Sequence, residues 1–262
     1  MPSPNINCNL SPNEQWKDGI NKAYESVKAT AQKCAKNKSG GCQVDAWNKW
    51  DEEIRTTVNA FNDYLSATTP NFRSLDWRYI KAMLWTESGA KDKAWDSRPM
   101  QFGNIGDKGK VELLSPDPIK KIEYELIVPK KYRTNLDTGA HNIHQGVAYL
   151  FKKLANFDFK LIYDPDPTTY FITVKQGDTL DKIAKANNTD IEILKNMNPE
   201  VVNPRNLKPN MKLKYRKGAI KRVITGWKDI SAMSIAKNYN GNGDPTYCAR
   251  LNYVLQLLRK DK

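Results

Sequence analysis

The segment between residues 170 and 216 constrains the fold more than any other part of the chain. Its apolar spacing and turn residues predict a strand, two short helices and a second strand, at 170–174, 179–186, 190–197 and 211–215. The preceding Asp-Pro-Asp-Pro run at 164–167 is typical of a boundary linker. We therefore predict a compact β-α-α-β module here.

The motifs of this segment occur in a specific order. Val174 ends the first strand, Gly-Asp-Thr-Leu follows, an Ile-Ala pair lies on the first helix, Leu-x-x-x-Asn-Pro ends the second, and Asn-Leu-x-Pro-x-x-x-Leu leads into the last strand. This order resembles a LysM module. LysM modules bind glycans that contain N-acetylglucosamine, so the resemblance implies peptidoglycan or chitin as the ligand.

The resemblance implies two binding loops, which would present backbone groups and small apolar side chains to a sugar. The residues that match are Gly177, Asp178, Thr179 and Leu180 in the first loop and Asn206, Leu207 and Pro209 in the second. The same Asp and Thr are also expected to form a turn and cap a helix. Asn210-Met211 replaces the common Gly-Gln, and Asn tolerates a left-handed turn.

The remaining sequence predicts a mainly helical chain, so the predicted fold class is α+β, mainly α. At the first helix, Ser11 is the expected N-cap, Pro12 the first helical residue and Glu14 the capping-box acid. Predicted helices cover residues 11–36, 44–65, 76–88, 140–156, 229–239 and 245–259. Residues 90–139 are expected to be loops with a small hairpin, built from 111–114 and 124–128.

Glu87 stands out within the predicted helix 76–88. It shares one helical face with Ile80, Met83 and Leu84, because residues three and four apart superpose on a helix. Desolvation and the negative helix end should raise the pKa of this carboxyl. A general acid for glycoside cleavage needs such a raised pKa. By itself, however, a Glu at a helix end is more often a solvated residue.

Four motifs give Glu87 a context: ESG at 87–89, RPMQFGN at 98–104, NIHQGVAYLFKKL at 142–154 and AKNYNG at 236–241. In this order they resemble the motifs of lytic transglycosylases and goose-type lysozymes. The usual Gly-Leu-Met-Gln is Arg-Pro-Met-Gln here, and the interval before it is short. The resemblance implies Glu87 as catalytic acid/base, Ser88 and Gln101 as catalytic-site lining, Met100 and Asn104 as cleft residues, and Tyr239 and Asn240 as the pair that orients the acid and contacts substrate.

The last motif follows the LysM-like segment, so the resemblance implies an inserted module. We predict a discontinuous lysozyme-like domain, residues 66–165 plus 218–262, interrupted by the module at 170–216. Residues 1–65 form an N-terminal helical region that either packs on the core or docks a partner.

Two reactions remain open at the glycan bond. Hydrolysis requires a second carboxylate, for which Asp92, Asp96 and Asp107 are the candidates, although loop aspartates are often turn residues. By resemblance, transglycosylases need one Glu, because a sugar hydroxyl closes an anhydro ring, and we favour this reaction. No cofactor is predicted, and no metal, since His141 and His144 lack a third ligand.

A net charge of +13 favours anionic partners. Zinc-finger spacing, RNP aromatics and a basic region with heptads are all absent from the sequence, so nucleic acid is not the predicted partner, and no apolar run predicts membrane insertion. The start has no apolar signal region. We expect action in the periplasm or at the cell wall after delivery by specialised secretion or lysis, as an antibacterial effector or a phage-type component, with an immunity protein or a secretion component as partner.

Four cysteines permit three disulfide pairings, and we favour Cys34 with Cys42 and Cys8 with Cys248, which implies an oxidising destination. Buried free thiols are the alternative. The alternative for the whole chain is a noncatalytic peptidoglycan-binding or adaptor protein on a lysozyme-like scaffold.

Overall fold

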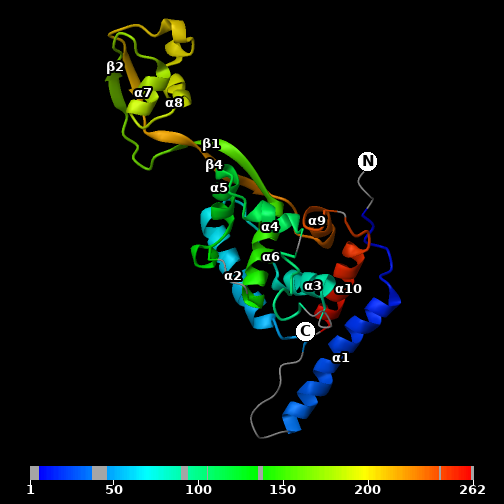
Figure 1. Cartoon of the computed structure of the whole chain (residues 1–262). Helices are drawn as coiled ribbons and strands as arrows, with labels where there is room; N and C mark the ends of the chain where they lie inside the picture. The colour runs from blue at the N-terminus through cyan, green and yellow to red at the C-terminus, as the bar shows by residue number, and fades with distance from the viewer. Residues whose placement is uncertain are drawn as a thin grey trace. The chain divides into compact units, whose positions relative to one another are not determined.

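The computed structural model divides the chain into two compact units (Figure 1). The structure describes residues 6–36, 46–89, 94–104, 106–134, 138–241 and 243–260, except for the side chains of 28–36 and 204. We call Met1–Asn156 with Ile224–Lys262 the helical unit and Phe157–Val223 the small unit. The chain therefore leaves the helical unit, builds the small one and returns, and the fold is α+β, mainly α.

The helical unit is built around α6 (Gly139–Leu154), which contacts α2 (Asp51–Thr68), α4 (Lys108–Leu113), α5 (Pro118–Ile127) and α9 (Ala232–Asn238). The helix α3 (Trp77–Glu87) packs between α2 and α10 (Tyr247–Arg259), and α1 (Glu14–Lys36) begins the chain's helices. A short 3-10 helix covers Lys130–Tyr132. The core is fully buried at Ile80, Ile143, Val147, Phe151 and Leu251. No helix among the described residues is both long and apolar enough to cross a bilayer.

The helix α3 follows its predicted limits closely. Asp76 caps it by accepting a hydrogen bond from Arg78 N, and Gly89 leaves it with a φ of +61°. The first two helices begin later than predicted. Asn13, rather than Ser11, accepts from Trp16 N at 3.3 Å. A run of three acids that begins at Asp51 favours the N-terminal end of α2, so α2 starts there instead of at residue 44.

The predicted hairpin of 111–114 and 124–128 is wrong, because both segments lie in or at the ends of helices. Asp107 accepts from Gly109 N at 2.7 Å and so caps α4. Asp117 caps α5 by accepting from Lys120 N at 2.9 Å, and Pro118 occupies the first turn. These caps override the β propensity of the Val, Ile and Tyr residues that follow.

A two-stranded sheet that the sequence analysis did not predict joins the two units. It pairs β1 (Ala155–Tyr163) with β4 (Gly218–Trp227), which are rich in aromatic and β-branched residues. The helix α6 accordingly ends at Leu154, and α9 and α10 follow β4 as the later predicted helices. Asp164 N donates to Lys217 O at 3.0 Å, so the two strands end side by side.

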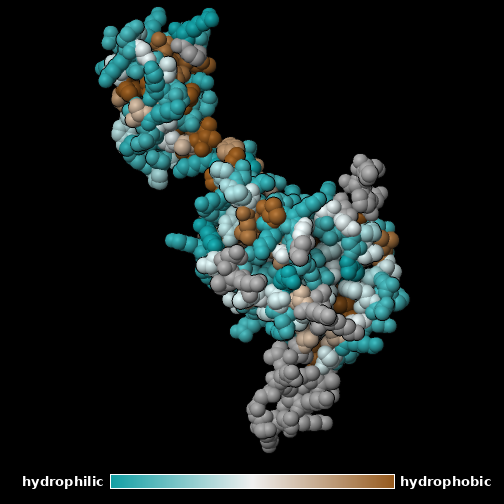
Figure 2. Space-filling view, in the orientation of Figure 1, coloured by the Kyte–Doolittle hydropathy of each residue, from teal (hydrophilic) through white to brown (hydrophobic). Residues whose placement is uncertain are grey.

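The small unit has the predicted β-α-α-β order: β2 (Tyr170–Thr173), α7 (Leu180–Ala186), α8 (Ile191–Met197) and β3 (Lys212–Tyr215). Short 3-10 helices at Pro199–Val201 and Pro204–Asn206 connect α8 to β3. β2 and β3 are antiparallel, with Tyr170 opposite Tyr215. The buried core of the small unit consists of Val174, Leu180, Ile183, Ala184, Leu194, Val201, Leu213 and Tyr215. In Figure 2 the surface of both units is predominantly hydrophilic.

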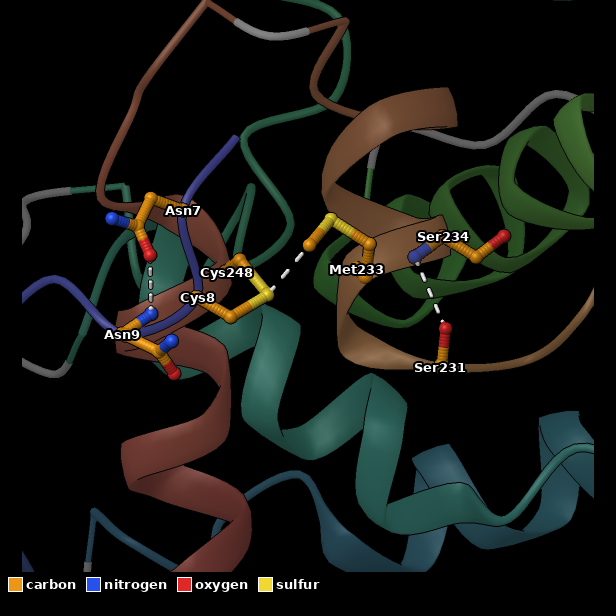
Figure 3. Close-up of a disulfide and its surroundings, with 7 residues drawn as sticks. All are labelled: Asn7, Cys8, Asn9, Ser231, Met233, Ser234 and Cys248. Carbon is orange, nitrogen blue, oxygen red and sulfur yellow. Dashed lines mark hydrogen bonds between the residues drawn. A yellow bond between two sulfur atoms is a disulfide. The ribbon is translucent and has the colours of Figure 1, made fainter. Parts of the chain in front are cut away.

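A disulfide joins Cys8 to Cys248, as predicted, with Cα atoms 4.8 Å apart (Figure 3). The sulfur of Met233 lies 4.0 Å from Cys8 Sγ. Because Sγ carries no proton in a disulfide, we treat this as a van der Waals contact. The predicted Cys34–Cys42 pair lies outside the described side chains.

Candidate active site and candidate glycan-binding loops

Glu87 ends α3, directly after the buried Thr86, and its side chain is half-buried. Tyr247, at the start of α10, donates a hydrogen bond from Oη to Glu87 Oε1 at 2.8 Å. Burial raises the pKa of Glu87 from 4.5 to about 7, and the Tyr247 hydrogen bond and Arg250 oppose that rise. The negative charges of Asp244 and Asp107 add to it. Burial is thus the main cause, as the apolar helical face predicts.

The first turn of α10 is fixed to the end of α3 by Arg250. Its guanidinium pairs with Asp244 and donates to Thr86 O at 3.2 Å. Asp244 also accepts from the backbone N and the hydroxyl of Thr246, each at 2.8 Å. These bonds position Tyr247, which is 2% exposed, against Glu87.

Tyr239 and Asn240 directly follow α9. Burial, and then the charge of Glu87, raise the pKa of the Tyr239 hydroxyl well above its usual range, which places Tyr239 in the electrostatic neighbourhood of Glu87. Its ring lies 5.4 Å from that of Tyr149. Asn240 Nδ2 is buried without a hydrogen-bond partner among the described residues.

Sequence reasoning missed Tyr247 as the direct partner of Glu87. The motif pointed to Tyr239 instead, and Asp244-Pro245 indicated only where a helix starts. Helical spacing does place Tyr247 and Arg250 three residues apart on one face, and this was the available signal.

The loop at 98–104 is fastened beside the end of α3. Ser88 Oγ donates to Pro99 O at 2.7 Å. From α6, Asn142 accepts from Met100 N at 2.9 Å and donates to Phe102 O at 2.6 Å. Ser88 and Asn142 therefore hold both flanks of Met100.

Met100 and Gln101 have different surroundings. The Met100 side chain is 1% exposed and packs on Gly146, where a Cβ atom would lie 2.9 Å from Met100 Cε. Gln101 has a φ of +53°, a strained conformation for a residue other than glycine, and its Oε1 accepts from Asn104 Nδ2 at 2.5 Å. The structure thus places the Met100 side chain in the core, whereas Gln101 and Asn104 bond to each other within the same loop.

The three candidate second carboxylates differ in position. Asp107 is a neighbour of Glu87 by its charge, but its two oxygens accept from Gly103 N at 2.6 Å and Gly109 N at 2.7 Å. Asp96 is exposed and pairs with Lys49. Asp92 lies outside the described residues.

The two histidines of α6 have separate contacts. His144 Nε2 lies 2.7 Å from Glu53 Oε1, and its ring lies 4.1 Å from that of Tyr132. His141 is buried, and burial lowers its pKa. Within the described part of the chain, no group of three His, Cys, Asp or Glu residues could hold a metal ion.

In the small unit, the two predicted loops are joined by the backbone. Asn210 N donates to Val174 O, and Val174 N donates to Met211 O, both at 2.8 Å. Asn210 has the left-handed φ of +68° that its position was expected to need. The loops at 174–180 and 206–211 therefore lie side by side.

The first loop combines turn, cap and core residues. Gly177 has a φ of +81°, and Asp178 accepts from Lys175 N at 2.7 Å. Thr179 caps α7 by accepting from Lys182 N at 3.2 Å, and Leu180 is buried in the core. Gly177 and Thr179 are the exposed members.

In the second loop, Asn206 donates from Nδ2 to Glu200 O at 3.0 Å. Leu207 packs against the core, whereas Asn206 and Pro209 are exposed. Asn198 is a buried residue whose side chain accepts from Lys214 N at 2.8 Å and donates to Lys214 O at 2.7 Å. It fixes the end of α8 to β3 and so supports this loop.

Paired loops on a β-α-α-β core define a small ligand-binding module. The family model that matches it is the LysM domain, over residues 172–215. The chain thus carries a peptidoglycan-binding module, whose ligands are glycans that contain N-acetylglucosamine. Searches of curated proteins and of solved structures return no match to the chain.

Proposed function

We propose that this chain is a peptidoglycan-degrading enzyme that cleaves the MurNAc-GlcNAc β-1,4 bond with Glu87 as general acid/base. The observation that carries the proposal is the hydrogen bond of 2.8 Å from Tyr247 to the half-buried Glu87 carboxyl, whose pKa desolvation raises to about 7. It occurs in a chain that also has a LysM domain. A carboxyl that is largely protonated just below neutral pH can give its proton to a glycosidic oxygen.

Tyr247 makes this proton available at a defined atom. Burial and the charge of Glu87 raise the pKa of the Tyr247 hydroxyl well above its usual range, so Tyr247 keeps its own proton and donates it to Oε1. The proton of Glu87 then resides on Oε2, from which it passes to the leaving sugar. After transfer, the carboxylate is stabilised by Tyr247 and Arg250 and can accept a proton from the attacking hydroxyl.

The lytic transglycosylase reaction fits the neighbouring acids better than hydrolysis does. Inverting hydrolysis requires a second carboxylate that can activate water. Asp107 uses both oxygens to accept backbone hydrogen bonds, and Asp244 is engaged by Thr246 and Arg250. We therefore propose that a hydroxyl of the substrate attacks and forms an anhydro sugar, with muramidase activity as the alternative.

In this proposal the LysM domain keeps the enzyme on its polymeric substrate at the cell wall or in the periplasm. A disulfide between Cys8 and Cys248 is consistent with an oxidising compartment. The role as antibacterial effector or phage-type component, with an inhibitor protein or secretion component as partner, is part of the same proposal.

Solubilisation of purified peptidoglycan by wild type, Glu87→Gln and Glu125→Gln tests the proposal. Glu125 is an exposed acid on α5 and serves as the matched control. We expect wild type and Glu125→Gln to release soluble material and Glu87→Gln to release none while it still cosediments with the polymer. Cosedimentation of a folded wild type without release would instead favour the noncatalytic binding protein.

A further inference from the structure

A pocket of about 540 Å³ lies where the loop near Glu87 meets α4 and α5. Asn104 and Asp107 line it from the loop. Asn104 hydrogen-bonds to Gln101, and the charge of Asp107 contributes to the raised pKa of Glu87, so two lining residues link the pocket to the candidate active site. Its other polar lining includes Lys108, Lys110, Glu112 and Lys120.

The two acids of this pocket are already engaged. Asp107 accepts from two backbone N–H groups, as described above. Glu112 pairs with Lys153 at 3.2 Å and accepts from the Tyr149 hydroxyl at 3.3 Å. The three lysines have no ion pair among the described residues, and all three are exposed. Three lysines against two acids, one of which is paired with Lys153, leave the pocket with a net positive charge.

Lys110 is held next to the loop by its aliphatic stem. A Cβ atom on Gly103 would lie 3.0 Å from Lys110 Cδ and 3.3 Å from its Nζ. Gly103, with a φ of +89°, thus leaves the space in which the lysine lies across the loop. The ammonium group therefore lies beside Gly103, which is two residues along the chain from Gln101.

We propose that this lysine pocket binds a carboxylate of the stem peptide attached to the glycan, an inference that rests on the proposed function. Peptidoglycan carries short peptides with free carboxyl groups, so a substrate cut at Glu87 presents anions beside the cleaved bond. A pocket of this volume is in the range that takes a ligand the size of a peptide side branch. Lysine acts here as a hydrated point charge for a carboxylate.

The test uses the full chain with Glu87→Gln, so that bound substrate is not consumed. Binding of soluble tetrasaccharide-peptide fragments is compared with binding of the same fragments after their carboxyl groups have been converted to amides. The additional changes are Lys110→Gln with Lys120→Gln, and Lys121→Gln as a control on the exposed part of α5 outside the pocket. Binding by the LysM domain is common to all variants, so every titration is fitted with one shared LysM term and the remaining term is compared.

We expect the double lysine change to weaken binding of the carboxylate fragments by about three- to tenfold and to leave the amidated fragments unaffected. The control should bind both fragments like its parent. An equal effect on both fragments, or none, overturns the proposal. So does lysine-dependent binding to anionic phospholipid vesicles with unchanged fragment binding, which assigns this face to lipid.

The two proposals can fail separately. If the lysine changes selectively weaken binding of the carboxylate fragments but the wild type releases no glycan products, the pocket proposal stands and the enzyme proposal fails. If the wild type releases glycan products but the lysine changes cause no selective loss of carboxylate binding, the enzyme proposal stands and the pocket proposal fails.

Discussion

Glu87 couples the stability of the protein to pH through a single proton. The pKa of this carboxyl is 4.5 in an unfolded chain and about 7 in the folded protein. Its contribution to stability is therefore fully present below pH 4.5 and is lost as pH rises through about 7.

Above pH 7 the folded protein holds Glu87 as a partly desolvated carboxylate, which lowers its stability, and replacing Glu87 by the uncharged Gln removes this cost. We expect Glu87→Gln to be more stable than wild type by roughly 2–4 kcal/mol at about pH 8, with little difference at about pH 4. Urea unfolding of both proteins at the two pH values measures this. A stability difference that is the same at both pH values would contradict the raised pKa.

Tyr247 should set the pH at which activity declines. Activity of the wild type is expected to fall as pH rises through about 7, because Glu87, the proposed general acid, loses its proton. The Tyr247 hydrogen bond lowers the pKa of Glu87, so Tyr247→Phe should shift this alkaline limb upward by about one pH unit and reduce the rate.

The control for this change is Tyr253→Phe, which removes another α10 hydroxyl, bonded to Asn21 at 2.8 Å. Its pH profile should match that of the wild type. A Tyr247→Phe profile that is lower in rate but unshifted in pH would show that the hydroxyl does not act on Glu87.

At the scale of elements, α6 supports the loop that carries Gln101. A Cβ atom on Gly146 would lie 3.1 Å or less from three atoms of Met100. We expect Gly146→Ala to cost about 1–3 kcal/mol of stability and to lower activity, because Met100 and its loop must shift. Gly19→Ala in α1, where a Cβ meets nothing within 4 Å, should instead stabilise by about 0.5–1 kcal/mol. Thermal unfolding measures the stability of the two variants, and peptidoglycan solubilisation measures their activity. Unchanged activity in Gly146→Ala would mean that activity does not depend on the position of this loop.

Elements were predictable where one local signal dominated. Asp76 and Gly89 gave the limits of α3, and spacing along it placed Glu87 on the buried face. α4 and α5 were not predicted, because the prediction gave more weight to β-prone residues such as Val111 and Tyr124 than to the helix caps at Asp107 and Asp117. In the structure the caps prevail.

The candidate site was predictable only in part, for a physical reason. Tyr247 lies 160 residues from Glu87, and their contact exists because α10 packs on α3. Nothing in either local sequence encodes that packing. Likewise, the hydrogen bonds that engage Asp107 depend on the backbone conformation at Gly103 and on the start of α4, where Gly109 lies.

At the scale of the whole molecule, the disulfide joins positions 240 residues apart. Such a cross-link restricts the unfolded chain, so Cys8→Ala with Cys248→Ala should cost about 3–5 kcal/mol. Activity should also fall near the melting transition, because Cys248 follows Tyr247 in the first turn of α10. Denaturant unfolding of this pair against wild type tests the claim, and equal stability would refute it.

The LysM domain should be separable from catalysis. Because Asp164 N bonds to Lys217 O, residues 165–216 can be replaced by an Asn-Gly turn that joins β1 to β4. The shortened protein should fold, cut soluble glycan fragments like wild type and bind insoluble peptidoglycan much more weakly. Unaltered binding to the polymer would place the main glycan contact elsewhere.

The most direct test of the central claim is mass spectrometry of the soluble products released from purified peptidoglycan by wild type and Glu87→Gln. We predict anhydro-muropeptides from wild type alone. Reducing-end muropeptides from wild type alone would keep Glu87 and change the reaction to hydrolysis. The same products from both proteins, or none from a folded wild type that binds the polymer, would contradict the assignment of Glu87 as the catalytic acid.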